Sequence, residues 1–473
     1  MIRKTDPQTI APYLKDASNF SGGCADEVII PETTSELVDF LQTNSLPVTV
    51  AGAGTGLTAS RIPNAGVIIS LERFNTIGQI ANASIDVGPA VSLADLQNYL
   101  QQTSGYFYPP NPTETLASFG GMVATNASGS RSYKMGVTRD YVLEVDVVLV
   151  NGKTVTLARG TSIADPLILD DGTEINFPEI GYSSPRCKNA AGYYMRSGMD
   201  WLDLFIGSDG TLGLFTRIRL KLLPRPDDFI SGILFFDREE SCWELVEKLR
   251  SLDGTTISPC SLEYFDKFSL KKLQKNHANI PVEARAALFF EQDVLKKEDY
   301  DSTLDAWFEF LTKEDVSLDD SWFAQNAKDV QHFHEFRHDI PVLINEENSR
   351  LGRVKIGTDM AVPDKHFMEM MEFYRKELSQ SELEFVIFGH LGDNHLHINL
   401  LPNPPEMDRA KSVYDILVVQ ILKWGGTVSA EHGVGKLKKS YFAKMVGRQA
   451  LEDLRKIKHA FDPEDRLGTG NIL

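Results

Sequence analysis

Short apolar, β-branched runs bounded by turn-forming residues dominate the first half of the chain, a pattern typical of strands. Such runs occupy positions 47–51, 67–71, 142–150 and 214–223. Long helical periodicity is nearly absent there, and glycine-rich segments separate the runs. We therefore predict a strand-rich unit over residues 1–225.

The pattern changes at Pro224-Arg225-Pro226, a proline-marked linker. Beyond it, amphipathic segments with helical spacing at 240–252, 300–313, 322–346 and 365–378 alternate with strand-like segments at 229–236, 287–291, 355–360 and 384–389. This indicates an α+β domain over residues 226–405. Helical spacing at 408–424 and 448–461 predicts a C-terminal helical segment over 406–473.

Charge and cysteine content exclude several classes of function. The 473 residues carry 48 Lys+Arg against 66 Asp+Glu, a net charge of -18, which disfavours nucleic acid and anionic lipid as partners. The four cysteines are too far apart in sequence for a CxxC site, so any iron–sulfur cluster must reside on another polypeptide. The N-terminus lacks the apolar core of a signal peptide, and the strongest apolar run is too short to span a membrane. We expect a soluble cytoplasmic protein.

Three glycine-rich loops are candidates for binding a phosphate-bearing cofactor. The first carries Gly52, Gly54 and Gly56 after a strand, the second runs over 109–129, and the third spans 207–213. Bare glycines let backbone N–H groups converge on a pyrophosphate. The first loop fits neither the Rossmann fingerprint, whose third glycine would fall at Leu57, nor the Walker loop. One such loop could be a tight turn, but three make chance turns a poor explanation.

A cluster of histidines in the second half is the candidate metal centre. Gly392-Asp393-Asn394 predicts a hairpin turn, which places His395, His397 and Asn399 on one face and folds His390 back toward them. A Glu-His pair follows in a glycine-rich turn at Glu431-His432. Imidazoles with a carboxylate suit Zn²⁺ or a similar divalent ion, although ordinary core hydrogen bonds explain the spacing equally well.

Taken together, the loop 51–57, the segment 120–140 and the loop 207–213 resemble the FAD-binding domain of the vanillyl-alcohol oxidase/PCMH flavoprotein superfamily. The whole chain is similar to the FAD-linked D-2-hydroxy acid dehydrogenases, the group of D-lactate and D-2-hydroxyglutarate dehydrogenases and the glycolate oxidase flavoprotein subunit. The resemblance implies an α+β protein. It would have a two-lobed FAD-binding domain (1–225), a substrate-binding cap domain with an antiparallel sheet (226–405) and a C-terminal segment (406–473) that completes the active site.

The resemblance also implies roles for particular residues. The metal ligands would be His390, His397 and Glu431, holding Zn²⁺ or Mn²⁺, and His432 would be the general base. Arg337, Lys355 and Asn399 would contact the substrate. FAD would be held, noncovalently because no histidine precedes His277, by Gly52, Ala53, Gly54, Thr55, Gly56, Pro112, Thr113, Ser118, Gly120, Gly121, Thr125, Asn126, Ser128, Gly129, Gly210, Thr211 and Asn471.

Two positions depart from the family pattern. His395 stands where relatives commonly carry Asn, and it could contact the metal, tune selectivity or face solvent. Leu467-Gly-Thr-Gly-Asn471 replaces the usual Asn-Pro-Gly-Lys near the C-terminus.

The activity implied is oxidation of a D-2-hydroxy acid to the 2-oxo acid, with the hydride passing to flavin N5 and the proton to His432. The electron acceptor would be a quinone, an electron-transfer flavoprotein, a cytochrome or an iron–sulfur subunit. The resemblance leaves open a homodimer and peripheral membrane association through the acceptor. An O₂-using oxidase and a flavin-carrying subunit of a glycolate oxidase-type complex are the alternatives.

Overall fold

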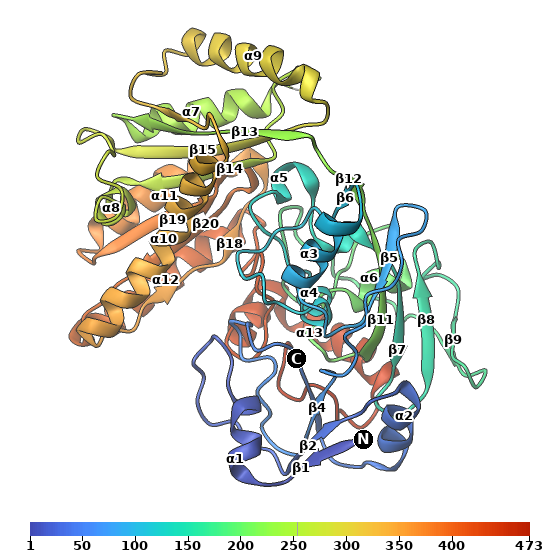
Figure 1. Cartoon of the computed structure of the whole chain (residues 1–473). Coiled ribbons are helices and arrows are strands. Elements are labelled where there is room, and N and C mark those ends of the chain that lie inside the picture. The colour runs from blue at the N-terminus through green and yellow to red at the C-terminus, as the bar shows by residue number, and fades with distance from the viewer. Residues whose placement is uncertain (253) are drawn as a thin grey trace.

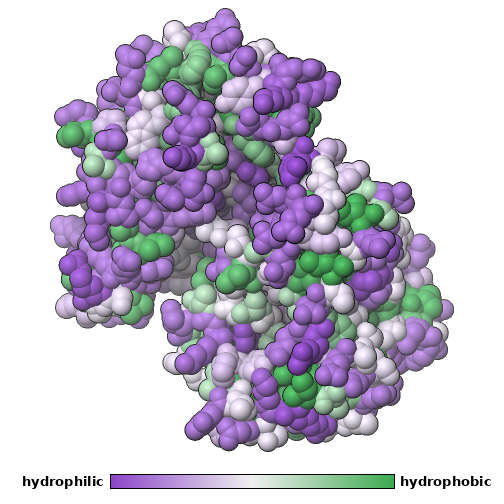
Figure 2. Space-filling view, viewed as in Figure 1, coloured by the Kyte–Doolittle hydropathy of each residue, from purple (hydrophilic) through white to green (hydrophobic). Residues whose placement is uncertain are grey.

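The computed structural model describes residues 1–252 and 254–473 and has two lobes (Figure 1). The lower lobe in Figure 1 holds strands β1–β12 together with the C-terminal helix α13, and the upper lobe holds β13–β20. Figure 2 shows that the surface is hollowed between the two lobes. In the part of the chain that the structure describes, no helix is both long and apolar enough to cross a membrane.

The first sheet of the lower lobe is small and mixed. Its strand order is β1 (Ile2–Lys4), β2 (Glu27–Ile30), β4 (Val67–Ser70) and β3 (Val48–Ala51), with β1–β2 antiparallel and the other pairs parallel. Helix α2 (Thr34–Thr43), capped by the Thr33 side chain, buries Leu37 and Phe40 against this sheet. The C-terminal segment contacts the same sheet, because the N–H of Val48 in β3 donates to the carbonyl of Arg466 at 2.7 Å. The C-terminal segment therefore returns to the lobe in which the chain began.

The second sheet of the lower lobe is antiparallel, in the order β5 (Ser84–Val87), β11 (Leu214–Lys221), β7 (Val142–Val148) and β8 (Thr154–Ala158). Helix α3 (Leu93–Thr103) is capped by the Ser92 side chain. With α2 it corrects our prediction that helical periodicity is nearly absent here, since both helices are short and show apolar spacing only on their buried side. The other elements of this lobe are α1 (Pro7–Ile10), β6 (Tyr106–Phe107), α4 (Phe119–Thr125), α5 (Ser132–Met135), β9 (Leu167–Ile168), β10 (Glu174–Ile175), α6 (Trp201–Phe205) and β12 (Leu223–Pro224).

The upper lobe is built on one antiparallel eight-stranded sheet. Its order is β16 (Trp322–Phe323), β13 (Asp228–Phe236), β15 (Ala286–Val294), β14 (Ser261–Asp266), β19 (Phe385–His390), β20 (His395–Leu400) and β17 (Ile356–Gly357), with β18 (Met360–Ala361) also paired to β20. All six residues of β14 are buried, so it shows no alternation, and our sequence reading missed it.

Helices cover both faces of this sheet. Adjacent residues of β13, such as Ile233 and Leu234, belong to different hydrophobic clusters, as the pleat requires. One cluster includes residues of α7 (Glu239–Arg250), α9 (Tyr300–Lys313), α11 (Phe367–Gln380) and α12 (Met407–Lys423), and the other includes residues of α8 (Lys267–Leu273) and α10 (Ala327–Leu351). Our prediction of a helix from 322 is wrong at its start, because Trp322–Phe323 pair with β13 and Asn326 caps α10.

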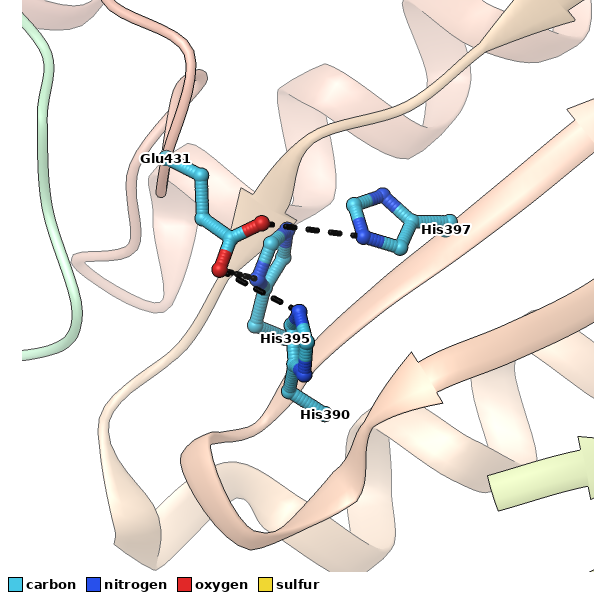
Figure 3. A group of neighbouring side chains, drawn as sticks. All are labelled: His390, His395, His397 and Glu431. Atoms are coloured by element: carbon cyan, nitrogen blue, oxygen red, sulfur yellow. Dashed lines mark ion pairs between the residues drawn. The ribbon is translucent and has the colours of Figure 1, made fainter. Parts of the chain in front are cut away.

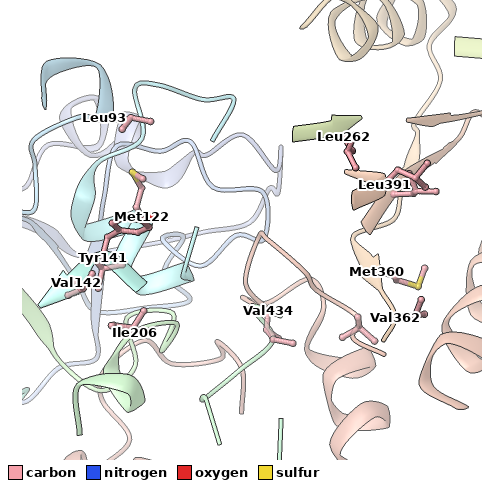
Figure 4. Packing of buried hydrophobic residues seen from close by; sticks show 14 of the residues in the cluster. Leu93, Met122, Tyr141, Val142, Ile206, Leu262, Met360, Val362, Leu391 and Val434 are labelled. Carbon is pink, nitrogen blue, oxygen red and sulfur yellow. The ribbon is translucent and has the colours of Figure 1, made fainter. Parts of the chain in front are cut away.

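A single hydrophobic cluster joins the two lobes. Figure 4 shows Met122 and Val142 of the lower lobe and Met360 and Leu391 of the upper lobe, with Val434 between them in this view. Helix α13 (Lys439–Phe461) changes direction at Gly447, whose φ is 78°, and its second part coincides with the helix predicted at 448–461. The lobes are thus held in a fixed relation by a shared core.

Candidate active site

A cavity of about 1580 Å³ is lined by residues of both lobes. This exceeds the roughly 300–1,000 Å³ of an ordinary small-ligand pocket, so it has room for a dinucleotide and a small acid together. Fifteen of the predicted flavin contacts line it: Gly52, Ala53, Gly54, Thr55, Gly56, Pro112, Thr113, Ser118, Gly120, Gly121, Thr125, Ser128, Gly129, Gly210 and Asn471.

The glycine loops fit a bound cofactor. The loop 52–56 follows directly on β3, and Gly54 has a φ of 88°, which favours glycine. A Cβ at Gly121 would meet only the Ser118 hydroxyl at 3.4 Å, and one at Gly56 would meet no protein atom closer than 4.0 Å. Protein packing therefore does not demand glycine at these two positions. Their missing side chains leave backbone open to a ligand that lies close against it.

Two predicted flavin contacts, Asn126 and Thr211, are absent from the cavity lining. Asn126 is buried with a φ of 50°, and its side chain accepts a hydrogen bond from the N–H of Arg139 at 2.9 Å. The Thr211 hydroxyl lies 2.8 Å from Tyr193 Oη and donates to the Ser208 carbonyl. Both side chains support the loops rather than face the cavity.

The predicted histidine hairpin forms the other wall. Strands β19 and β20 pair antiparallel, and Asn394 in the turn has a φ of 54°. Side chains of His390, His395 and His397 point toward the Glu431 carboxylate (Figure 3). One ligand atom from each of these four residues lies within 4.8 Å of every other. Imidazole nitrogens and a carboxylate oxygen suit Zn²⁺ or Mn²⁺ better than Mg²⁺ or Ca²⁺, so the donor set fits a divalent transition metal.

Carboxylate and carbonyl groups orient two of these imidazoles. Glu263 accepts from His390 Nδ1 at 2.5 Å, which turns His390 Nε2 toward Glu431 Oε1 at 3.2 Å. His397 Nδ1 lies 3.5 Å from the Thr358 carbonyl, and its Nε2 is 3.8 Å from Glu431 Oε2. Such outer partners fix the tautomer of a ligating histidine. Burial alone would lower the pKa of His390, but Glu431 and Glu263 raise it to about 9.

Glu431 is held by groups from the lower lobe. Lys188 Nζ lies 2.6 Å and Ser128 Oγ 2.9 Å from its Oε1. Burial lowers the pKa of the Lys188 ammonium, but Glu431 and Asp393 outweigh this and raise it. Ser128 was predicted as a flavin contact, and it both lines the cavity and donates to Glu431.

The general base predicted from the sequence is placed by Asp359. His432 Nδ1 lies 3.0 Å from Asp359 Oδ2, and the backbone N–H groups of Glu431 and His432 each donate to the same carboxylate at 3.1 Å. Lys438 Nζ donates to it at 2.5 Å. Burial alone would raise the pKa of Asp359, but His432 and Lys438 hold it well below its usual range. An ionised Asp359 therefore keeps the proton of His432 on Nδ1 and leaves Nε2 as the acceptor.

The predicted substrate contacts also line the cavity. Arg337, on α10, donates through Nε to Glu263 at 2.7 Å, and its Nη1 lies 3.4 Å from His338 Nε2. Lys355 has no hydrogen-bond or ion-pair partner among the described residues, and burial lowers its pKa. Asn399 is buried opposite Gly357, where a Cβ would approach the Asn399 amide oxygen at 3.3 Å. A pair of cations and an amide thus face the same space as the imidazoles.

Sequence reasoning missed Asp359, Glu263 and Lys188. Glu263 carried a signal, since it is an acidic residue flanked by Leu262 and Tyr264 in the middle of β14. Asp359 lies within the predicted strand 355–360, where an acidic side chain beside Thr358 was a weak signal. Lys188 lies in an irregular segment with no pattern to single it out.

Comparison with known proteins agrees with this architecture. Residues 228–472 match the family model for FAD linked oxidases, C-terminal domain, and residues 25–158 match that for an FAD binding domain. The chain is 28% identical to glycolate oxidase subunit GlcD of Bacillus subtilis, covering 98% of this chain and 92% of that protein. It is 27% identical to D-lactate dehydrogenase of Anaerostipes hadrus, covering 97% and 92%.

Solved structures show the same fold. The structure of p-cresol methylhydroxylase with substrate bound superposes with a TM-score of 0.72 at 16% identity, covering 99% of this chain and 93% of that one. A 4-ethylphenol oxidase from Gulosibacter chungangensis gives a TM-score of 0.70 at 13% identity, covering 99% and 94%. The expected two-lobed FAD-binding architecture with an antiparallel sheet is confirmed. The chain belongs to the FAD-linked oxidases and is an FAD-dependent oxidoreductase.

Proposed function

We propose that this enzyme oxidises a D-2-hydroxy acid of the D-lactate or D-2-hydroxyglutarate type to the 2-oxo acid. The observation that carries the proposal is that one cavity is lined by the glycine loops, by the cations Arg337 and Lys355, and by His390, His397 and Glu431. An anionic substrate needs such local positive charge in a chain whose net charge is -18.

Each of these residues has its own role in the proposed reaction. A bound flavin supplies the hydride acceptor, and a divalent ion held by His390, His397 and Glu431 supplies positive charge beside the substrate oxygens. His432 Nε2 accepts the proton of the C2 hydroxyl. Arg337 and Lys355 bind carboxylate oxygen, and the Asn399 amide orients the substrate.

The proposed division of the chain follows from the same reading. Residues 1–225 bind FAD, 226–405 form the cap over the substrate, and 406–473 carry Glu431 and His432 into the site. Support comes from Glu431, which contacts Ser128 and Lys188 of the first part and His390 of the second, so that the three parts meet at one carboxylate.

A second candidate is a flavoprotein subunit that passes electrons to an iron–sulfur partner. Similarity to a glycolate oxidase subunit over 98% of the chain favours it. The four cysteines, which are free in the structure, are too dispersed to hold a cluster. Other acceptors for the main proposal are a quinone, an electron-transfer flavoprotein or a cytochrome.

Anaerobic addition of substrate to the isolated chain tests the proposal. D-lactate, D-2-hydroxyglutarate, glycolate and D-malate would each be mixed with the FAD-loaded protein, and flavin bleaching would be followed. Bleaching by one of these acids supports a self-sufficient dehydrogenase, and bleaching only after a partner is added supports the subunit. No bleaching by any of them, with or without a partner, contradicts both.

A further inference from the structure

The imidazole of His395 has no role in the chemistry proposed above. It lies at the start of β20, between the Glu431 carboxylate on one side and the Asp359 carboxylate on the other. We propose that His395 is a fourth protein ligand of the divalent metal ion, beside His390, His397 and Glu431. This inference rests on the metal site of the proposed function and adds one donor to it.

Burial makes an idle imidazole unexpected here. The side chain is 0% exposed, and although Nε2 lies 3.0 Å from the Asp359 carboxylate, Nδ1 has no hydrogen-bond partner among the described residues. Leaving a buried polar atom without a partner is costly, so native structures seldom keep one. Of the alternatives that the sequence left open for His395, exposure to solvent is therefore excluded.

Distances place Nδ1 of His395 where a ligand atom belongs. It lies 3.9 Å from Glu431 Oε1, too long for a hydrogen bond. Bonds of about 2.0–2.1 Å to one tetrahedral ion put neighbouring donor atoms roughly 3.3 Å apart. The corresponding separations from Glu431 to His390 and His397 are 3.2 and 3.8 Å, so the His395 distance is close to the longer of these two.

Asp359 presents the ring in the required tautomer. Nε2 of His395 lies 3.0 Å from Asp359 Oδ1. A carboxylate at this nitrogen favours the proton there and leaves the lone pair on Nδ1, which is the side that faces Glu431. A purely structural histidine bonded to Asp359 would not need its second nitrogen aimed into a group of three metal-ligating side chains.

The charge around the site also favours a neutral donor. Glu431 Oε1 is already in contact with Lys188 at 2.6 Å, which offsets part of the attraction of this carboxylate for a cation. A third imidazole adds a donor without adding charge. Three imidazoles and one carboxylate favour Zn²⁺ over Mn²⁺. Substrate oxygen would then bind as a fifth ligand.

X-ray absorption at the zinc edge tests this directly, because it counts imidazole ligands without turnover. The full-length protein would be loaded with one equivalent of Zn²⁺ and with FAD. We expect three imidazoles in the wild type and two in His395→Asn, with zinc affinity, measured against a chromophoric chelator, falling roughly 100-fold or more. His432→Asn is the matched control, since it removes a nearby imidazole that also contacts Asp359, and it should retain three.

The outcomes separate this inference from the function on which it rests. Two imidazoles in the zinc-loaded wild type would overturn the fourth ligand and leave the proposed function standing, and this measurement needs no variant to fold. Equal zinc affinity in His395→Asn and wild type would overturn it as well. A wild type that retains no zinc would remove the metal from the proposed function and this ligand with it.

Discussion

Replacing Asp359 with asparagine should slow flavin reduction far more than it disturbs binding. The Asp359 carboxylate lies 3.0 Å from His432 Nδ1, and its side chain is only 3% exposed. In the proposed reaction it would stabilise the imidazolium that forms when His432 takes the substrate proton. An asparagine amide turned toward Nδ1 would donate to it, so Nε2 would carry the proton and could not accept another.

The size of the effect follows from the lost charge. Two unit charges about 4 Å apart at an effective dielectric constant of roughly 20 interact by about 4 kcal/mol. That corresponds to about three decades in rate. His432 is 29% exposed, so water screens part of this interaction. We therefore expect a loss of about two to three decades in the rate of flavin reduction.

Anaerobic stopped-flow measurement of flavin bleaching at saturating substrate isolates this step. Asparagine also places an amide beside Lys438 Nζ and the Ser429 hydroxyl, which now donate to the carboxylate, so the melting temperature should fall. FAD content therefore normalises the rates. The double variant with His432→Ala should be no slower than His432→Ala alone, since Asp359 acts through that ring. A rate within tenfold of wild type, or additive losses in the double variant, would refute the reasoning.

Other substitutions have separate readouts. His432→Ala should keep FAD and zinc yet lose two to four decades in flavin reduction, whereas Glu431→Ala should first lower zinc occupancy, measured by elemental analysis, and recover partly in excess Zn²⁺. Lys355→Gln should weaken substrate binding roughly tenfold in a flavin-absorbance titration without lowering the melting temperature, because the ammonium has no ion-pair partner among the described residues. Burial raises the pKa of Asp266 to about 7, so stability should fall as pH rises through 7. Asp266→Asn, which keeps the cap on Ser269, should reduce the difference in melting temperature between about pH 5 and about pH 8.5.

Local pattern was sufficient to predict the histidine hairpin. A glycine-rich turn between two apolar strands fixes register, and period two then places alternate side chains together. The ring centroids of His395 and His397 are 4.6 Å apart, and those of His390 and His397 are 5.6 Å apart. The face predicted from spacing is confirmed for these three rings.

The sequence pattern could not predict which carboxylate would contact which imidazole. Asp359 and His432 are separated by 73 residues along the chain, and Glu263 and His390 by 127. These contacts arise only when β14 lies beside β19 and the Glu431-His432 turn reaches the end of β18. No spacing rule within a single segment contains that information.

The same long-range pairing explains why the site depends on docking of the two lobes. Arg337 and His390 share the Glu263 carboxylate, while Lys438 and His432 share Asp359. Each buried ion is thus offset by a partner from another element, which limits the cost of taking it out of water. For Glu431 the cationic partner, Lys188, comes from the lower lobe. Separating the lobes would leave Glu431 without that ammonium, and the carboxylate that ligates the proposed metal is therefore stabilised in its position only when the lobes are closed on each other.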